Sequence, residues 1–410
     1  MTIESIVIVG AGEAGARAAI ELREGGFNGE ITIVGRENMH PYERPPLSKT
    51  VLLMPQTPAP ATILDEQKCG AYQINLITGK EAIKIERGQK RVVFEDGSSK
   101  GYDRLLLATG ANPRRLMLEG SDTSGVMYLR TYADALVLRS RLSAGKRVVV
   151  IGGGFIGLEV AASARETGCE VTLLDLAPRI LMRGVPAQIA GQMESRHREA
   201  GVQFKLGTGI EQIHAPAGRE HAVTLSDGTI LKCDVIVAGI GAIPETTLAS
   251  ASGLVVDNGI VVDDQLRTSD PHIYAAGDCC SFPHHLFGGQ RMRLEAWRNA
   301  VDQAIVAARN LVGGTESYAA VPWFWSDQYD KTLQVVGLPD LGCVTVERSG
   351  LNGNQLYVHL DEEGTIVAAS GIGDGSLGKE IRILEKLIER RAKPSSEQLS
   401  DPAIRLKSLL

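Results

Sequence analysis

The fold is decided by one stretch of the chain, residues 148–159, which is VVVIGGGFIGLE. Four apolar residues predict a short buried strand, which a glycine turn and a helix follow. Gly152, Gly154 and Gly157 match the G-x-G-x-x-G pattern of loops that bind the pyrophosphate of a dinucleotide. The first glycine allows the tight turn, the second lets backbone N–H groups approach phosphate oxygens, and the third lets the helix pack on the strand. The partial positive charge at the helix N-terminus favours the same anion.

An acidic residue ends the next predicted strand. Residues 171–174 are VTLL, and Asp175 follows them. A carboxylate at this position accepts hydrogen bonds from the ribose hydroxyls of NAD and repels the 2′-phosphate of NADP. Residues 176–178 contain no cation, and Arg179 is the one nearby exception. A glycine turn alone would also fit a βαβ unit without a ligand, but this complete arrangement predicts an NADH site.

The same arrangement occurs a second time near the N-terminus. Residues 6–9 are IVIV, and residues 10–15 are GAGEAG, which again match G-x-G-x-x-G before a predicted helix. The next strand, residues 31–34, leads to Arg36 and Glu37. Glu37 is the natural ribose acid here, and Arg36 would lie along the adenine or reach a phosphate. Two such units predict two different dinucleotides in one chain.

An internal repeat supports the two units. Residues 102–113, YDRLLLATGANP, and residues 233–244, CDVIVAGIGAIP, share an acid, an apolar strand, small residues and a proline at the same offsets. Each copy follows an Asp-Gly turn and lies downstream of one glycine loop. Each unit is therefore expected to end in a strand whose glycine keeps the backbone close to the ligand.

The composition changes after residue 320. Residues 322–328, PWFWSDQ, are dense in aromatic side chains, in a chain with only 5% aromatic residues. Strand-like runs at 333–337, 343–348, 355–360 and 365–370 and a helix at 379–392 predict a third, α+β domain. The aromatic cluster belongs either to the core of this domain or to a wall over the active site.

We therefore predict an α/β fold with two Rossmann-like dinucleotide-binding domains and a C-terminal α+β domain. The first dinucleotide-binding domain is discontinuous, residues 1–112 and 245–320. The second comprises residues 113–244, and the α+β domain comprises residues 321–410.

Composition bounds the class of protein. The chain has 410 residues, of which 43% are hydrophobic, and no apolar run approaches the roughly 18–20 residues that span a bilayer. The N-terminal residues lack the basic region of a signal peptide, so we expect a cytoplasmic protein. A net charge of −6 argues against nucleic acid or an anionic membrane as the main partner.

The six cysteines form no redox or zinc motif. They stand at 69, 169, 233, 279, 280 and 343, and none forms C-x-x-C or C-x-x-x-x-C. The adjacent pair at 279 and 280 has poor geometry for a redox dithiol. We expect reduced thiols and no metal site.

These motifs together resemble the glutathione-reductase-like flavoprotein disulfide reductases. The resemblance includes ATG at residues 108–110 and TSDPHIYAAGD at residues 268–278. Within this group, residues 41–49, 152–159 and 322–328 are similar to the FAD-dependent NADH:ferredoxin reductases of bacterial oxygenase systems, of the putidaredoxin reductase and biphenyl or toluene dioxygenase reductase type. The resemblance covers essentially the whole chain.

The resemblance implies tightly bound FAD at the N-terminal loop and NADH at the central loop. The residues that it assigns to FAD are Gly10, Gly12, Ala14, Gly15, Arg36, Glu37, Arg44, Lys49, Ala82, Arg130, Gly277, Asp278 and Trp297. The residues assigned to NAD are Gly152, Gly154, Ile156, Gly157, Glu159, Asp175 and Gly241. Lys49 and Glu159 are the candidate catalytic ion pair beside the flavin.

The implied reaction is hydride transfer from NADH to the flavin, followed by single-electron transfer to a [2Fe–2S] ferredoxin. The ferredoxin would feed a Rieske aromatic-ring dioxygenase or a cytochrome P450. The missing dithiol disfavours disulfide reduction. Alternative acceptors are rubredoxin, a quinone or an ascorbate radical. A non-enzymatic alternative, a redox-sensing protein like the apoptosis-inducing flavoproteins, would carry a long basic insertion that residues 321–410 lack.

A ferredoxin is acidic, and so is this chain. We therefore expect a local basic docking patch, with Arg291, Arg293 and Arg298 as candidates; ordinary solvated arginines are the alternative. The chain would act as a monomer or a homodimer.

Overall fold

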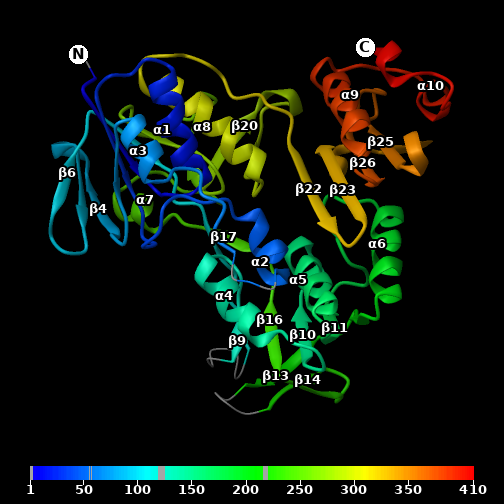
Figure 1. The fold of residues 1–410 in the computed structure, drawn as a ribbon. Helices are drawn as coiled ribbons and strands as arrows, with labels where there is room; N and C mark the ends of the chain where they lie inside the picture. Colours follow the sequence, from blue (N-terminus) through cyan, green and yellow to red (C-terminus); the bar gives the residue numbers. More distant parts are fainter. Residues whose placement is uncertain (1–2, 55, 57, 119–124, 216–219) are drawn as a thin grey trace. The chain divides into compact units, whose positions relative to one another are not determined.

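The computed structural model describes residues 3–54, 56, 58–118, 125–215 and 220–410, which belong to two compact units. Unit 1 comprises Met1–Glu43, Pro60–Asn112 and Ile243–Pro322, and unit 2 comprises Arg44–Ala59, Pro113–Ala242 and Trp323–Leu410 (Figure 1). These two units do not test the predicted boundaries of three domains, which stay a prediction.

A parallel sheet of five strands forms the centre of unit 1, in the order β19-β7-β1-β2-β3. After Ser5, the residues of its central strand β1 are apolar and buried on both faces, as expected for a strand between two layers. Helices α1 and α8 pack closely against each other, and alanines on the buried face of α1 allow this approach. The bounds of these elements are β1 (Ser5–Val9), α1 (Glu13–Glu24), β2 (Glu30–Val34), β3 (Ile74–Ile77), β7 (Arg104–Leu107), β19 (Ile273–Ala275) and α8 (Trp297–Leu311).

Short elements complete unit 1. The strands β4, β5 and β6 form a small antiparallel sheet before the first copy of the repeat, and β18, β20 and β21 form another small sheet. The bounds are α3 (Glu66–Ala71), β4 (Ala82–Glu86), η2 (Arg87–Gln89), β5 (Arg91–Phe94), β6 (Ser99–Gly101), α7 (Thr247–Ala251), β18 (Ile260–Val261), β20 (Cys280–His284), η3 (His285–Phe287) and β21 (Gln290–Met292). The chain passes between the units at β8 (Ala111–Pro113), at β17 (Ala242–Pro244), after Glu43, after Ala59 and after Pro322.

Unit 2 contains a second parallel sheet of five strands, in the order β12-β11-β10-β16-β9. Its central strand, β10, is the apolar run that precedes the central glycine loop. A three-stranded antiparallel sheet, β13-β14-β15, follows in the chain as in unit 1. The bounds are η1 (Pro45–Ser48), α2 (Thr50–Leu53), β9 (Val126–Met127), α4 (Tyr132–Arg141), β10 (Arg147–Ile151), α5 (Phe155–Glu166), β11 (Glu170–Asp175), α6 (Ala187–Glu199), β12 (Gln203–Leu206), β13 (Ile210–His214), β14 (His221–Leu225), β15 (Ile230–Cys233) and β16 (Val235–Ala238).

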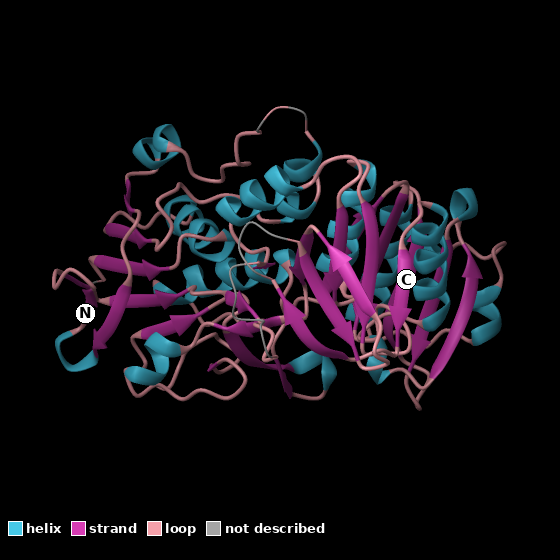
Figure 2. Cartoon of the chain, turned by 90° about the horizontal axis from the view of Figure 1, so that it is seen from below, coloured by secondary structure: helices cyan, strands magenta, loops and turns pink. Residues whose placement is uncertain are grey.

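The C-terminal part of unit 2 is an antiparallel sheet in the order β22-β23-β26-β25-β24, against which α9 packs. Its edge strand β22 carries the aromatic-dense stretch and packs against α5. The bounds are β22 (Trp323–Gln328), β23 (Lys331–Gly337), η4 (Pro339–Leu341), β24 (Val344–Ser349), η5 (Leu351–Gly353), β25 (Gln355–Leu360), β26 (Ile366–Gly373), α9 (Leu377–Glu389), α10 (Ser396–Ser400) and η6 (Leu406–Leu409). Figure 2 shows these strands and helices in separate colours.

The predicted fold class is confirmed: there are two parallel sheets with helices, each with its own glycine loop after the central strand, and an antiparallel C-terminal sheet with helices. Among the described residues, no helix is long and apolar enough to cross a bilayer.

Candidate functional site

The N-terminal glycine loop has two positions that only glycine can occupy. Gly10 has φ +119°, and a Cβ there would lie 2.0 Å from the Ala108 carbonyl oxygen. A Cβ on Gly15 would lie 1.9 Å from the Gly10 carbonyl oxygen, so this glycine allows α1 to approach β1. Gly12 differs, because nothing lies within 4 Å of its Cβ position. The loop thus leaves space beside the N-terminus of α1, where a dinucleotide pyrophosphate fits.

Three other residues predicted to bind FAD gather around this loop in unit 1. Gly277 has φ +85°, and its Cβ position is 3.2 Å from the Ala14 Cβ. Trp297 Nε1 donates a hydrogen bond of 3.0 Å to the Glu13 carboxylate in the first turn of α1. Burial raises the pKa of Glu13. Asp278 follows Gly277 directly and is partly exposed.

The adenosine-side residues of the prediction also lie in unit 1. Arg36 is exposed and donates to the Asn112 side chain at 3.3 Å. The Tyr42 hydroxyl donates to Glu37 at 2.6 Å, a contact that sequence reasoning missed although Tyr42 stands in the stretch that carries the resemblance. Ala82 begins β4 and pairs with Phe94 in the small antiparallel sheet.

The central loop in unit 2 has the same geometry. Gly152 has φ +106°, and its Cβ position is 2.4 Å from the Gly239 carbonyl oxygen. A Cβ on Gly157 would lie 2.0 Å from the Gly152 carbonyl oxygen, whereas nothing lies within 4 Å of the Gly154 position. Ile156 and Gly241 are exposed, the latter with φ +103°. The central loop therefore leaves the same open space at the start of α5.

Asp175 is bound to the loop that precedes it. One carboxylate oxygen accepts the Gly153 N–H at 2.6 Å, and the other accepts the Ala177 N–H at 2.7 Å. Each oxygen retains a further lone pair for a ribose hydroxyl. Arg179 donates to the carbonyl groups of Ile180, Leu181 and Val185, so its guanidinium is already engaged. Arg179 is thus not placed to bind a 2′-phosphate.

Lys49 and Glu159, predicted as an ion pair, do form one in unit 2. Lys49 Nζ lies 2.8 Å from Glu159 Oε1, and the Glu159 side chain is only 4% exposed against 21% for Lys49. The Ser48 hydroxyl donates to the other carboxylate oxygen at 2.5 Å, and the Ser326 hydroxyl donates to Oε1 at 2.6 Å. These bonds satisfy a buried carboxylate that would otherwise be costly. Sequence reasoning missed both serines, although each stands in a stretch that carries the resemblance.

Two further residues of the FAD prediction are neighbours in unit 2. Arg44 donates from its guanidinium to the Arg130 carbonyl oxygen at 2.5 Å. The Arg130 N–H donates to Asp134, which belongs to the capping box at the start of α4. Their assignment to FAD, like those of the other site residues, stays a prediction.

The cysteines provide no dithiol. Cys279 and Cys280 are both fully buried, and burial raises the pKa of each thiol, which disfavours the reactive thiolate. In the part of the chain that the structure describes, no cluster of His, Cys, Asp or Glu could hold a metal ion.

The arginines predicted to dock a ferredoxin are engaged within unit 1. Arg291 donates to the carbonyl groups of Val262 and Ser281. Arg293 pairs with Glu295 at 2.5 Å, and Arg298 pairs with Asp302 at 3.4 Å on the same helix. The two acids reduce the positive charge that these arginines present.

Comparison with known proteins relates this geometry to a family. The pyridine nucleotide-disulphide oxidoreductase family matches residues 4–304, and the reductase C-terminal family matches residues 323–410. The chain is 42% identical to the ferredoxin–NAD(+) reductase component of the anthranilate 1,2-dioxygenase system of Burkholderia cepacia, over 100% of both chains. It is 43% identical to a rubredoxin–NAD(+) reductase of Pseudomonas putida, over 81% of this chain and 86% of the relative.

A solved structure shows the same similarity. The crystal structure of the covalent putidaredoxin reductase–putidaredoxin complex superposes with a TM-score of 0.93 at 37% identity, over 100% of this chain and 98% of the other. The chain belongs to the pyridine nucleotide-disulphide oxidoreductases and, within them, to the ferredoxin reductases of oxygenase systems, flavoproteins that pass electrons from NADH through FAD to a ferredoxin.

Proposed function

We propose that this chain oxidises NADH and delivers the electrons singly to a [2Fe–2S] ferredoxin that feeds a Rieske dioxygenase or a cytochrome P450. FAD, when bound, supplies the chemistry that accepts a hydride and releases single electrons. The observation that carries the proposal is the ion pair between Lys49 and the buried Glu159, which lies on the helix that follows the NADH loop. The ion pair provides fixed charges that can stabilise the charged, reduced form of FAD. The chain has no redox dithiol that could take the electrons instead.

The residues divide between two cofactors in this proposal. The Gly10–Gly15 loop, Glu37 and Asp278 hold the pyrophosphate, ribose and ribityl groups of FAD. The further residues that we assign to FAD are Arg36, Arg44, Lys49, Ala82, Arg130, Gly277 and Trp297. We also retain the division into an FAD domain, an NAD domain and a C-terminal domain with the boundaries predicted from the sequence.

The Gly152–Gly157 loop holds the pyrophosphate of NADH, and Asp175 accepts from its ribose hydroxyls. Because Arg179 is bound to three backbone carbonyl groups, it does not offset the repulsion between Asp175 and a 2′-phosphate. Ile156, Glu159 and Gly241 complete the NAD contacts. NADH is therefore the expected reductant.

Lys49 and Glu159 have complementary tasks. An ammonium group has three N–H donors, of which the ion pair uses one, so Lys49 can donate to the cofactor while Glu159 holds its position. Glu159 in turn is held by Ser48 and Ser326 on separate segments. The pair thus orients a positive charge without any need for a general acid or base.

The proposal is tested by NADH-dependent reduction of cytochrome c. Rapid reduction only when a [2Fe–2S] ferredoxin is added is expected, and equal rates without ferredoxin would contradict the proposal. The rubredoxin relative supports a second candidate acceptor. A parallel assay with rubredoxin at the same concentration decides between the two, because the true partner should give the higher kcat/KM.

We also propose that the protein acts in the cytoplasm as a monomer or homodimer. Sedimentation of the purified flavoprotein over a range of concentrations tests the oligomeric state.

A further inference from the structure

A chain of hydrogen bonds connects Glu159 with the surface of unit 2, and beyond Ser326 it consists of residues that the proposed function does not use. Ser326 Oγ donates to Glu159 Oε1 at 2.6 Å, and Gln328 Nε2 donates to Ser326 Oγ at 2.9 Å. His197 Nε2 lies 2.7 Å from Gln328 Oε1, and the Tyr329 hydroxyl lies 3.3 Å from His197 Nδ1. The chain therefore joins α5, β22 and α6.

The direction of these bonds follows from the chemistry of the groups. Because Gln328 Oε1 can only accept, His197 Nε2 must carry a proton. Nδ1 of the neutral imidazole is then an acceptor for the Tyr329 hydroxyl. Every group thus donates toward Glu159, and successive bonds of this kind polarise one another. The result is a Ser326 hydroxyl with one defined orientation.

The inner part of this chain is buried. Ser326 and His197 are 0% exposed, and Gln328 is 2% exposed. Ser326 and Gln328 are two positions apart on β22, so their side chains point to the same face of the strand. A buried polar network is stable only when each member is satisfied, which makes the loss of any one member costly.

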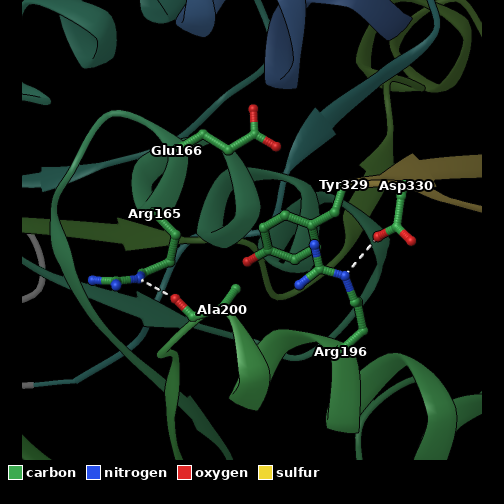
Figure 3. Close-up of a pocket in the computed structure, with 6 residues that line it drawn as sticks. All are labelled: Arg165, Glu166, Arg196, Ala200, Tyr329 and Asp330. Carbon is green, nitrogen blue, oxygen red and sulfur yellow. Dashed lines mark hydrogen bonds and ion pairs between the residues drawn. The ribbon is translucent and has the colours of Figure 1, made fainter.

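The outer end is anchored in a strained turn. Tyr329 has φ +55° between β22 and β23, a conformation that bulky residues rarely adopt. The Arg196 guanidinium lies 4.4 Å from the centre of the Tyr329 ring, and it pairs with Asp330 at 2.6 Å (Figure 3). These contacts hold the tyrosine at the wall of a pocket of about 400 Å³ lined by Arg165, Glu166, Arg196, Ala200, Tyr329 and Asp330.

We propose that His197 and Gln328 are positioning residues that orient the Ser326 hydroxyl and, through it, the Glu159 carboxylate against Lys49. The inference rests on the proposed function, in which Lys49 and Glu159 act at the cofactor. Glu159 Oε1 receives both the Lys49 ammonium and the Ser326 hydroxyl. When Ser326 loses the donor behind it, its hydroxyl can rotate, and the carboxylate loses one of its three contacts.

The chain offers a matched control at His359. This histidine is also buried, and its bonds go to the hydroxyl groups of Ser370 and Thr345 within the C-terminal sheet. Burial lowers the pKa of His197 and of His359 to about 4, so both are neutral at pH 7. A purely structural role predicts similar effects for the two histidines, whereas positioning predicts an effect for His197 alone.

Stopped-flow reduction of the bound flavin by saturating NADH measures the effect. His197→Leu should lower the rate constant about fivefold, equivalent to roughly 1 kcal/mol, the loss expected for one hydrogen bond. His197→Gln, which supplies an amide N–H in place of Nε2–H, and His359→Leu should remain within about twofold of wild type. The apparent KM for NADH should not change. An unchanged His197→Leu rate, or an equal fall in His359→Leu, would overturn the proposal.

A double-mutant cycle shows whether the effect passes through Glu159. In a Glu159→Gln background, His197→Leu should cause no further decrease in the rate constant. If His197→Leu lowers the rate constant fivefold in both the wild-type and the Glu159→Gln background, His197 does not act through Glu159.

Spectroscopy separates this proposal from the proposed function. ¹⁵N NMR of the histidine-labelled, oxidised flavoprotein should show His197 protonated at Nε2, and Ser326→Ala should shift its signals but not those of His359. A His197 protonated at Nδ1, or no response to Ser326→Ala, would refute the hydrogen-bond chain. Unchanged kinetics in Glu159→Gln together with the expected spectra would instead refute the proposed role of Glu159.

Discussion

The two glycine loops have the same turn geometry, but each contacts the strand that follows its helix, β2 or β11, in a different way. Gly10 and Gly152 take corresponding positions, since each donates its N–H to a carbonyl group near the end of the neighbouring strand, Gly10 to Val34 and Gly152 to Leu174. In unit 1 the next contact is apolar: the Cβ position of Gly35, directly after β2, lies 2.5 Å from the Ala11 Cβ. In unit 2 the corresponding residue is Asp175, the last residue of β11, which accepts the N–H of Gly153.

This difference has a functional consequence. In unit 2 the Asp175 carboxylate binds the glycine loop and, in the function that we propose, also the ribose, which would couple the loop to the ribose acid. In unit 1 the acid that we propose for the ribose, Glu37, stands two positions after Gly35 and accepts a hydrogen bond from Tyr42. We therefore propose that the two loops share one turn geometry and select different dinucleotides through the acid at or beyond the end of the second strand.

The first prediction tests the shared part of the comparison and has the largest effect. Gly15→Ala and Gly157→Ala should each destabilise their unit by about 3 kcal/mol or more, because the new Cβ would overlap a backbone carbonyl oxygen. Gly12→Ala and Gly154→Ala, which place a Cβ in open space, are the matched controls. They should cost about 1 kcal/mol or less in stability, as N-cap substitutions do, while weakening FAD or NADH binding. Denaturant unfolding and cofactor titration measure the two effects, and equal destabilisation by all four variants would contradict the geometry.

Glu159→Gln tests the role of the buried carboxylate on α5, the helix that follows the central glycine loop. We expect FAD to remain bound while flavin reduction by NADH slows about tenfold or changes its pH dependence, because the Lys49 charge loses its buried partner. Stopped-flow reduction across pH measures this. Wild-type kinetics at every pH would show that the role of Glu159 is mistaken.

Asp175→Ala tests the coupling between the loop and the ribose. The ratio of kcat/KM for NADH to that for NADPH should fall about tenfold, since the repulsion of the 2′-phosphate is removed. Arg179→Ala is the control and should leave that ratio unchanged, because the guanidinium is bound to backbone carbonyl groups. A large loss of NADPH turnover in Arg179→Ala would mean that this arginine binds the coenzyme.

The buried histidines of unit 2 predict an acid-sensitive stability. The folded pKa of His359 is lowered by burial to about 4, from a usual value of 6.5, so the unfolded state binds more protons between these values. Stability should therefore be complete above pH 6.5 and fall as the pH decreases toward 4. Replacing His359 with Gln should reduce the loss between pH 7 and 5 by up to about 2 kcal/mol, measured by denaturant unfolding. An unchanged pH slope would show that His359 does not titrate in this range.

The smallest effect is expected at the proposed docking arginines of unit 1. Reversing the charges of Arg291, Arg293 and Arg298 together should raise the KM for ferredoxin about threefold and flatten its salt dependence. The effect is modest because Glu295 and Asp302 already pair with two of these arginines. If the KM for ferredoxin and its salt dependence both stay unchanged, these arginines do not dock the ferredoxin.

Much of the fold was predictable from local patterns. The helix predicted at residues 379–392 corresponds to α9 (Leu377–Glu389), and the two parallel sheets follow the two predicted βαβ units. The strand β22 (Trp323–Gln328) was not predicted, because its aromatic residues lack the alternation of a half-buried strand. An aromatic run of this kind indicates that the side chains are packed, but it does not indicate which helix or strand they pack against.

The candidate site was predictable only in part. Lys49 and Glu159 came from a resemblance, and the structure brings them within 2.8 Å. Ser48 and Ser326 were missed, because serine is common and its hydroxyl acquires a role only through the partner it meets. The role of His197 could not be predicted either, because it depends on the residues that contact its ring.

The sequence by itself determined the two glycine loops, the acid after each second strand and the absence of a redox dithiol. These features are local, because a turn with positive φ or a close helix–strand contact requires glycine wherever it occurs. Only the tertiary structure decided the surroundings of Glu159. Ser48 and Ser326 lie 111 and 167 positions away from it, and Gln328 lies 131 positions from His197. Hydrogen bonds across such separations depend on how helices and strands pack, and no local pattern of residues encodes that partner choice.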